Sequence, residues 1–298
     1  SSAASDVYKR QILFMRTSKI QFPKRFSFFF LLFCILGIMG YARSQQNTIF
    51  HAVVAKDGTG DYTTVQSAID AVPENLKSPW LIFVKNGSYE EQVIIPQNKP
   101  FIHLIGQDKE RTIIHLKLNV GGKPDANTKD LAYWHYSVHN PKSAVSHFEG
   151  AVVNINASDF YSENISYVND WGLEAQNGPQ ALALKTKADR IAFYNCKFRS
   201  FQDTWMTTTR DADRHYVKEC WLEGAVDYFY GGGNALVEES TLYNVRSGSV
   251  IVAPCHESVK YGYVFRNCVI DGNEQAADGK LKLGRPWHLS LIHISEPT

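Results

Sequence analysis

Cysteine and methionine are scarce in this 298-residue chain, with five and three copies. No Cys-x-x-Cys pair occurs, so the spacing typical of structural zinc sites is missing. His135 and His139 are four residues apart, but they lack the intervening glutamate of a metalloprotease helix. The run Gly231-Gly232-Gly233 is not followed by Lys-Ser/Thr, so it indicates a turn and not a phosphate loop. We therefore predict no cofactor and no metal.

A strong charge of either sign is also missing. The formal net charge is +1, but seven basic residues and one acid fall within residues 1–44. The remaining chain holds 24 basic and 29 acidic side chains, a net charge of −5. This mildly acidic body argues against a nucleic-acid partner.

Long hydrophobic runs are limited to one, from Phe28 to Gly40. A basic stretch follows Met15 and precedes this run, and Ala42 and Ser44 come after it with the spacing of a signal-peptidase site. The run of about 13 residues is too short for a membrane span, which needs roughly 20. We predict a signal peptide over residues 15–44 and secretion to the extracellular space; a transmembrane anchor is the alternative.

The sequence patterns at the two ends of the chain differ from those of the residues between them. Residues 1–14 precede the expected initiator, and residues 289–298 break off from the preceding pattern. We interpret both as non-native and expect one domain over residues 45–288.

Cysteine use after the signal peptide leaves several pairings open. Cys196, Cys220, Cys255 and Cys268 allow three complete pairings, between which the sequence does not choose. In a secreted glycoprotein three sequons would be usable, at Asn86, Asn156 and Asn164. The alternative for Asn156 and Asn164 is a structural role.

Strand patterns dominate beyond residue 48, with one early helix. Thr64 is a suitable N-cap for a helix from Val65 to Val72, which Pro73 would end. Asn86-Gly87 is typical of a turn. The expected strands before residue 119 are Phe50–Val54, Trp80–Val84, Val93–Ile95, Phe101–Ile105 and Thr112–Leu116.

A degenerate repeat follows, because five tetrapeptides each lie between two β-like runs. They are Glu163-Asn164-Ile165-Ser166, Tyr194-Asn195-Cys196-Lys197, Lys218-Glu219-Cys220-Trp221, Glu238-Glu239-Ser240-Thr241 and Arg266-Asn267-Cys268-Val269. Their third positions are 31, 24, 20 and 28 residues apart. Units of this size cannot bury a face alone, so they predict an all-β solenoid, a parallel β-helix. Cys196 and Cys220 would then stack inward on adjacent turns, as a thiol ladder or a disulfide. A β-sandwich is the alternative fold.

Two aspartates come after successive β-like runs. Asp203 comes after one run and Asp227 closes the next, both among apolar neighbours. On adjacent strands their carboxyls would lie about 5 Å apart and face one cleft. Two carboxyls so close cannot both ionise freely, so one tends to stay protonated. This favours an acid and nucleophile pair; the alternative is two turn aspartates.

Six motifs in order give the chain a resemblance to the pectinesterases, carbohydrate esterases that demethylate pectin. They cover roughly residues 49–288. The motifs are Val54-Ala55-Lys56-Asp57-Gly58-Thr59-Gly60-Asp61-Tyr62, Gly87-Ser88-Tyr89-Glu90-Glu91, Gly178-Pro179-Gln180-Ala181-Leu182-Ala183-Leu184, Gln202-Asp203-Thr204, Gly224-Ala225-Val226-Asp227-Tyr228-Phe229-Tyr230-Gly231 and Leu283-Gly284-Arg285-Pro286-Trp287. The resemblance implies a right-handed parallel β-helix with a short N-terminal helix.

The resemblance also implies roles for six residues. Asp227 would be the nucleophile, and Asp203 would protonate the departing methanol and later activate water. The remaining implied roles are oxyanion donors (Gln180, Gln202), a cationic partner of Asp227 (Arg285) and a sugar-packing ring (Trp287). The implied substrate is methyl-esterified homogalacturonan in the cell wall. A proteinaceous pectinesterase inhibitor is an implied partner, and we expect a monomer.

The chain departs from the family pattern at three places. Phe229 and Tyr230 stand where a β-branched aliphatic residue and a phenylalanine are usual, and about three extra residues separate Asp203 from Asp227. The chain also ends soon after Trp287, where family members continue with further coils, so we expect a C-terminally truncated form. No inhibitor-like pro-domain is expected, because the β-helix pattern begins directly after the signal peptide. The alternatives are a pectin-cutting lyase or polygalacturonase, or a non-catalytic wall-binding relative.

Overall fold

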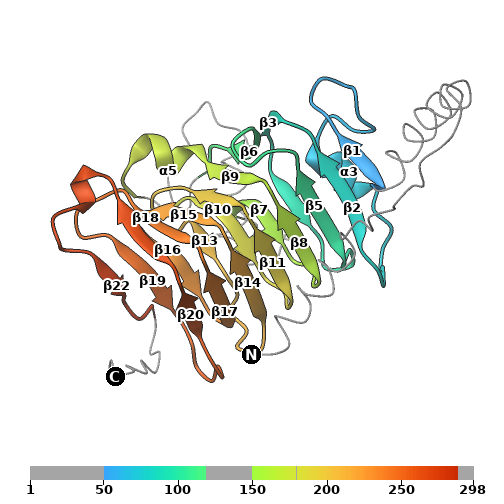
Figure 1. The fold of residues 1–298 in the computed structure, drawn as a ribbon. Coiled ribbons are helices and arrows are strands. Elements are labelled where there is room, and N and C mark those ends of the chain that lie inside the picture. Colours follow the sequence, from blue (N-terminus) through green and yellow to red (C-terminus); the bar gives the residue numbers. More distant parts are fainter. Residues whose placement is uncertain (1–49, 119–149, 179, 288–298) are drawn as a thin grey trace, which may run out of the picture. The chain divides into compact units, whose positions relative to one another are not determined.

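The computed structural model describes residues 50–118, 150–178 and 180–287, which fold into three parallel β-sheets (Figure 1). The expected signal peptide, both terminal segments and the His135/His139 pair lie outside these residues. Within the described part of the chain, no helix is long and apolar enough to cross a bilayer.

Each turn of the chain gives one strand to each sheet, and every pairing between neighbouring strands is parallel. Sheet 1 consists of β1 (Ala52–Val54), β2 (Trp80–Val84), β5 (Ile102–Gly106), β8 (Phe160–Glu163), β11 (Ile191–Tyr194), β14 (Arg214–Lys218), β17 (Asn234–Glu238) and β20 (Tyr263–Arg266). Sheet 2 consists of β3 (Gly87–Glu90), β6 (Thr112–Leu116), β9 (Ser166–Asn169), β12 (Lys197–Arg199), β15 (Trp221–Gly224), β18 (Thr241–Asn244) and β21 (Val269–Gly272). Sheet 3 consists of β4 (Val93–Ile95), β7 (Ala151–Ile155), β10 (Leu182–Thr186), β13 (Trp205–Met206), β16 (Val226–Gly231), β19 (Val250–Pro254) and β22 (Lys282–Gly284).

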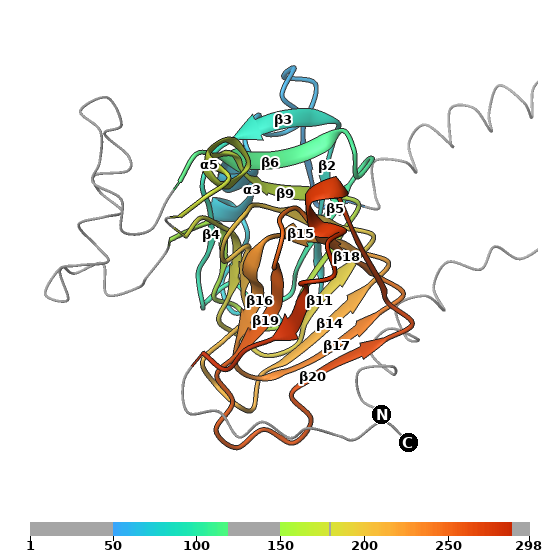
Figure 2. The same ribbon diagram turned by 90° about the vertical axis from the view of Figure 1, so that its left-hand side faces the viewer.

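This arrangement is a parallel β-helix, so the predicted fold class is confirmed and the β-sandwich is excluded. Figure 2 looks along the stack of coils, with the three sheets around a common interior. Aromatic rings from successive coils fill that interior. Tyr167 stacks on Phe198 at 5.5 Å between centroids, and Trp205 contacts Phe198 at 4.7 Å and Phe229 at 5.1 Å. These contacts join each coil to the next through the core.

The tetrapeptide repeat marks the corner between sheets 1 and 2. Its second residue is left-handed in every copy: Asn164 (φ 58°), Asn195 (49°), Glu219 (55°), Glu239 (50°) and Asn267 (54°). A left-handed residue turns the strand sharply, and asparagine tolerates this conformation better than most residues. The side chains also form a ladder, since the Asn195 amide donates to Asn164 Oδ1 at 2.7 Å. The repeat therefore encodes one bend per coil.

Cys196 and Cys220 form a thiol ladder and not a disulfide, the first of the two predicted alternatives. Cys196 and Cys220 lie on adjacent coils and are buried, and the Cys196 amide donates to Cys220 Sγ at 3.3 Å. All four described cysteines are free thiols.

The short helix α3 (Val65–Asp70) closes one end of the core with Val65, Ala68 and Ile69. Its N-cap is Thr64, as predicted, and it ends two residues before the predicted Val72. The Glu91 carboxylate accepts hydrogen bonds from the amides of Val65 and Gln66 at 2.8 and 2.9 Å. Negative charge is favourable at this position because the first amides of a helix lack partners.

Within the described part of the chain there are two other short helical segments, α5 (Asp170–Ala175) and the 3-10 helix η2 (Glu274–Ala276). The expected turn at Asn86-Gly87 is confined to its first residue. Gly87, read as part of a turn, opens β3. Asn-Gly indicates a bend, and the bend here joins β2 to β3.

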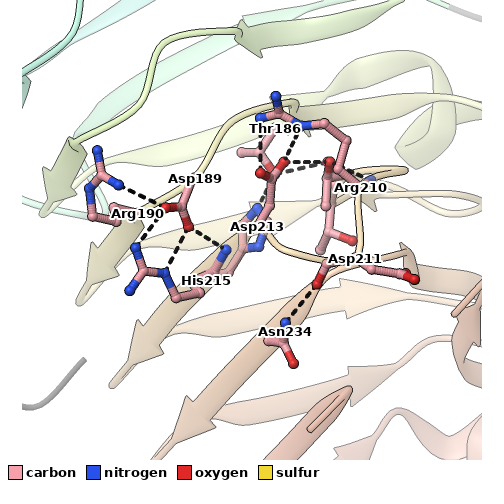
Figure 3. A network of polar contacts seen from close by, with 11 residues as sticks. Thr186, Asp189, Arg190, Arg210, Asp211, Asp213, His215 and Asn234 are labelled. Carbon is pink, nitrogen blue, oxygen red and sulfur yellow. Dashed lines mark hydrogen bonds and ion pairs between the residues drawn. The ribbon is translucent and has the colours of Figure 1, made fainter. Parts of the chain in front are cut away.

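A polar network covers the corner between sheets 3 and 1 (Figure 3). Asp189 lies between two arginines and accepts from Arg190 at 2.8 Å and from Arg214 at 2.7 Å. Asp213 is 3% exposed and accepts from Arg210 at 2.9 Å. Alternating charges such as those of residues 210–214 are typical of a solvated loop, but Asp213 is buried. Its burial comes from packing between coils, which local charge alternation does not report.

Neutral histidines lie buried beneath this surface. His215 is 3% exposed, its Nε2 lies 2.9 Å from Thr186 Oγ1, and burial lowers its pKa to about 4. Burial also lowers the pKa of His103 to about 4. In an unfolded chain both would titrate near 6.5.

We expect the free energy of unfolding to fall as the pH drops from about 6.5 to 4. In this window the unfolded chain binds protons that the folded chain does not, which costs roughly 3 kcal/mol per histidine. Urea titrations at pH 7.5, 6 and 4.5 measure the slope. His215→Gln should make the slope shallower, because it removes one buried neutral imidazole. Equal slopes for His215→Gln and the parent chain would contradict this account.

Candidate active site

Asp203 and Asp227 lie side by side on adjacent coils of sheet 3. The bridge pairs Gln202 with Val226, and the Asp203 amide donates to the Val226 carbonyl at 2.9 Å. The two aspartates are therefore in register, one strand spacing of about 4.8 Å apart along the stack. The predicted placement on adjacent coils is present.

Local backbone distortion aims both side chains. Asp203 has φ 62° and Asp227 has φ 50°, both in the left-handed region. The register of β16 against β19 also shifts between Val226 and Phe229, so Asp227 lies within a bulge. Bulges re-aim side chains, and strained backbone of this kind clusters at functional sites. Two neighbouring left-handed aspartates thus mark this position within an otherwise regular sheet.

The Arg285 guanidinium forms a bidentate ion pair with the Asp227 carboxylate. Its Nε donates to Oδ1 at 2.8 Å and its Nη2 to Oδ2 at 2.5 Å. The amide of Arg285 donates to the Val252 carbonyl at 3.0 Å, which fixes the residue beyond β22, across β19 from Asp227. A bidentate guanidinium keeps a carboxylate ionised and fixes its orientation. The predicted contact between Arg285 and Asp227 is therefore present, with the Asp227 side chain only 11% exposed.

Asp203 has the opposite electrostatic setting. Burial and the neighbouring charge of Asp227 raise the pKa of Asp203 to about 7, while hydrogen bonds from Tyr230 and Gln202 and the charge of Arg285 oppose the rise. A carboxyl that titrates near neutrality can both donate and accept a proton. The pair therefore consists of one carboxylate held by arginine and one carboxyl poised to exchange protons.

The two glutamines lie on neighbouring coils beside this pair. The Ala181 amide donates to the Gln202 carbonyl at 3.0 Å, which places Gln180 one coil before Gln202. Gln202 hydrogen-bonds to the Asp203 carboxyl. Gln180 is half-buried just before β10. Their amides are on the coils that an oxyanion site beside Asp227 would use, and their donor role stays a prediction.

Trp287 and Tyr230 add an aromatic border. Trp287 is 41% exposed and meets the Tyr230 ring edge-on, with centroids 5.2 Å apart. Sequence reasoning treated Tyr230 only as a departure from a family pattern. The sequence carries no signal for this role, because residues three apart in a regular strand point to opposite faces, and the register shift between Val226 and Phe229 is visible only in the structure.

Replacing Tyr230 with phenylalanine should move the pH profile of the site. The Tyr230 hydroxyl donates to the ionised form of Asp203 and so lowers the Asp203 pKa; its loss should raise that pKa. The alkaline limb of kcat/KM should then shift to higher pH, because Asp203 stays protonated longer. Tyr243→Phe, on sheet 2, is the matched control. An alkaline limb that does not move, or that moves to lower pH, would refute the contact.

Among the described residues, no cluster of three or more His, Cys, Asp or Glu is arranged to hold a metal ion. The chemistry that we derive for this site is that of its carboxyl, guanidinium and amide groups.

The fold and site define the chain as a parallel β-helix protein with a paired carboxyl site. A family profile described as Pectinesterase matches residues 51–133 and 135–293. Pectinesterase 31 of Arabidopsis thaliana is 34% identical over 236 residues, covering 78% of this chain and 68% of that protein. A pectinesterase of Petunia integrifolia is 31% identical over 247 residues, covering 80% of this chain and 59% of that protein. The chain thus belongs to the pectinesterase family.

Solved structures agree with this membership. A pectin methylesterase from carrot is 26% identical with a TM-score of 0.65, over 80% of this chain and 70% of that one. Pectin methylesterase PemA from Erwinia chrysanthemi is 26% identical with a TM-score of 0.67, over 81% and 72%. Another pectin methylesterase structure, in complex with a hexasaccharide, has a TM-score of 0.66. The chain spans from 40% to about two thirds of the length of the first curated relatives it matches.

Proposed function

We propose that this protein hydrolyses methyl esters of homogalacturonan to free carboxylates and methanol. The observation that carries the proposal is the carboxyl pair. Asp227 forms a bidentate ion pair with Arg285, and the pKa of Asp203 is raised to about 7 by burial and by the charge of Asp227. Membership of the pectinesterase family and the hexasaccharide complex of a related structure support a pectin substrate.

In the first half of the reaction, an Asp227 oxygen attacks the ester carbonyl carbon. The carbonyl oxygen gains negative charge, which amide donors from Gln180 and Gln202 stabilise; each such donor contributes on the order of 3 kcal/mol. The bond to the methoxy group then breaks. Protonated Asp203 gives its proton to the departing methoxide, so methanol leaves and an acyl-enzyme anhydride with Asp227 remains.

In the second half, Asp203 acts as a base. Its carboxylate removes a proton from water, the hydroxide attacks the galacturonate carbonyl, and the bond to Asp227 breaks. Asp203 is protonated again and Asp227 is once more a carboxylate beside Arg285. Trp287, partly exposed next to Tyr230, offers a ring face for a sugar.

The setting proposed for this activity is the plant cell wall. Residues 15–44 would direct secretion, and residues 45–288 would form the catalytic domain. Asn86 and Asn156 would be glycosylation sites, whereas the Asn164 amide is engaged by Asn195 at the coil bend. A proteinaceous inhibitor would be a partner, and the enzyme would act as a monomer.

Arg285→Lys tests the proposal directly. Lysine keeps the positive charge but cannot fix both oxygens of Asp227, and a displacement of about 1 Å can cost roughly a hundredfold in rate. Methanol release from methyl-esterified pectin should therefore fall about a hundredfold in kcat with little change in KM. Arg199→Lys is the matched control, because Arg199 also forms a bidentate ion pair, with Glu223 on sheet 2. Equal losses in both variants, or no methanol from the parent chain, would refute the proposal.

A further inference from the structure

Sheet 2 and the adjoining helix α5 carry a second group of reactive side chains, distinct from the carboxyl pair on sheet 3. Ser88 Oγ lies 2.7 Å from Nε2 of His115, and Nδ1 of the same ring lies 2.6 Å from Oδ2 of Asp170. The three residues come from β3, β6 and the first position of α5, which lie together in both ribbon views (Figures 1 and 2). Nothing in the proposed pectin chemistry uses them.

The hydrogen bonds fix the roles of these groups. A carboxylate only accepts hydrogen bonds, so Asp170 receives the Nδ1 proton of His115. The neutral ring then presents the Nε2 lone pair, and the Ser88 hydroxyl donates to it. A serine within hydrogen-bond reach of a base, whose base is oriented by a third group, is the arrangement that activates a nucleophile. We propose that Ser88, His115 and Asp170 form a serine-type nucleophilic site that hydrolyses esters of small neutral acyl groups, such as acetyl esters.

The position of Ser88 leaves the nucleophile accessible. Ser88 is exposed, and β3 is the last strand of sheet 2. The amides of Gly87 and Glu91 point to β6, since they donate to the carbonyls of Arg111 and His115 at 2.8 and 3.0 Å. In a strand the direction alternates, so the Ser88 amide points to the open edge. It can donate to the oxygen of an ester carbonyl that Ser88 attacks.

Charge at the site selects the acyl group. Glu90 lies opposite His115 in the strand pairing and is exposed, and Asp170 lies on the other side of the ring. Both carboxylates place negative charge beside the ring. They also repel an acyl group that carries its own negative charge. A short neutral acyl group on an alcohol suits this setting.

The reaction balances with water as the only co-reactant. Ser88 Oγ bonds to the acyl carbon while its proton moves to His115 Nε2. The bond to the alcohol oxygen breaks, and His115 returns the proton to the alcohol. Water then attacks the seryl ester with His115 as base, which releases the carboxylic acid and restores Ser88. With one edge amide as the oxyanion donor, the rate should be modest, because loss of a second such donor typically costs about 10²–10³ in kcat.

The test uses the full chain with p-nitrophenyl acetate and with phenylmethylsulfonyl fluoride. We expect a burst of p-nitrophenol, close to one per chain, and a sulfonyl label on Ser88 by peptide mass mapping. Ser88→Ala and His115→Gln should abolish the burst and the label. Asp170→Asn should lower kcat at least tenfold without raising KM, a split that lost packing would not produce. Ser78→Ala, at another exposed serine, should change nothing.

Pectin demethylation separates this site from the carboxyl pair. Ser88→Ala should release methanol from pectin at the parent rate, whereas Asp227→Asn should keep the burst and lose methanol release. A burst that survives in Ser88→Ala, or a label on other residues only, would overturn the inference whether or not the chain demethylates pectin.

Discussion

Asp227→Asn is expected to abolish methanol release, with a loss on the order of 10⁴-fold or more. A neutral amide is a poor nucleophile, and removing the nucleophile of a catalytic group that acts as a unit costs nearly all of its chemistry. The fold should survive, because Asp227 has φ 50° and asparagine accepts the left-handed region well. Methanol assays on methyl-esterified pectin, with circular dichroism of the same samples, measure both halves of this result.

The matched control for Asp227→Asn is Asp271→Asn, which makes the same change at an exposed aspartate of β21. It should keep the parent rate. Methanol release by Asp227→Asn near the parent rate would show that another group attacks the ester, and Asp227 would then serve only to position Arg285.

The fold was largely readable from the sequence because its repeating unit is local. Each tetrapeptide places a residue such as Asn164 or Asn195 at the bend and an inward side chain after it, so the pattern reports a backbone requirement. Several strands were predicted to the residue, among them Trp80–Val84. The start of β3 at Gly87 was missed, since Asn-Gly marks a bend but carries no information on the conformation of the segment beyond it.

Contacts between coils were far less readable. Arg285 meets Asp227 across 58 residues, and only the family resemblance suggested that contact. Asp213 lies in a run of alternating charges but is buried, because neighbouring coils pack around it. Ser88 and His115 carry no local signal at all, as the solenoid brings together residues 27 apart. In a β-helix, sequence patterns report the bend of each coil, while function depends on the register between coils.

Asp203→Asn should stop turnover and, at the same time, stabilise the protein at neutral pH. Methoxide then lacks its proton source, so methanol release should fall by roughly 10²–10⁴-fold or more, the usual contribution of a positioned acid. The stability gain is a consequence of linkage. Burial and Asp227 raise the pKa of Asp203 to about 7 in the folded chain, whereas an unfolded aspartate titrates near 4.

The sign and the pH window of this gain are specific. A carboxyl with a raised folded pKa stabilises the fold below about pH 4, and this contribution is lost as the pH rises toward about 7. Above that pH the loss reaches at most about 4 kcal/mol. Asparagine at position 203 does not titrate and suits the left-handed backbone, at φ 62°. The difference in unfolding free energy between Asp203→Asn and the parent should therefore grow from about pH 4 to about pH 7 and then level off.

Urea titrations of the parent chain, Asp203→Asn, Asp227→Asn and Asp203→Asn/Asp227→Asn at several pH values test this coupling. Part of the pKa rise comes from the charge of Asp227, so in an Asp227→Asn background the change at position 203 should give a smaller, flatter gain. If Asp203→Asn raises the free energy of unfolding equally at every pH, the gain comes from the backbone preference of asparagine. If Asp203→Asn lowers the free energy of unfolding at pH 8, the folded chain stabilises Asp203 as a carboxylate. In either case Asp203 could not act as the acid near neutrality, and the proton for methanol would have to come from another group.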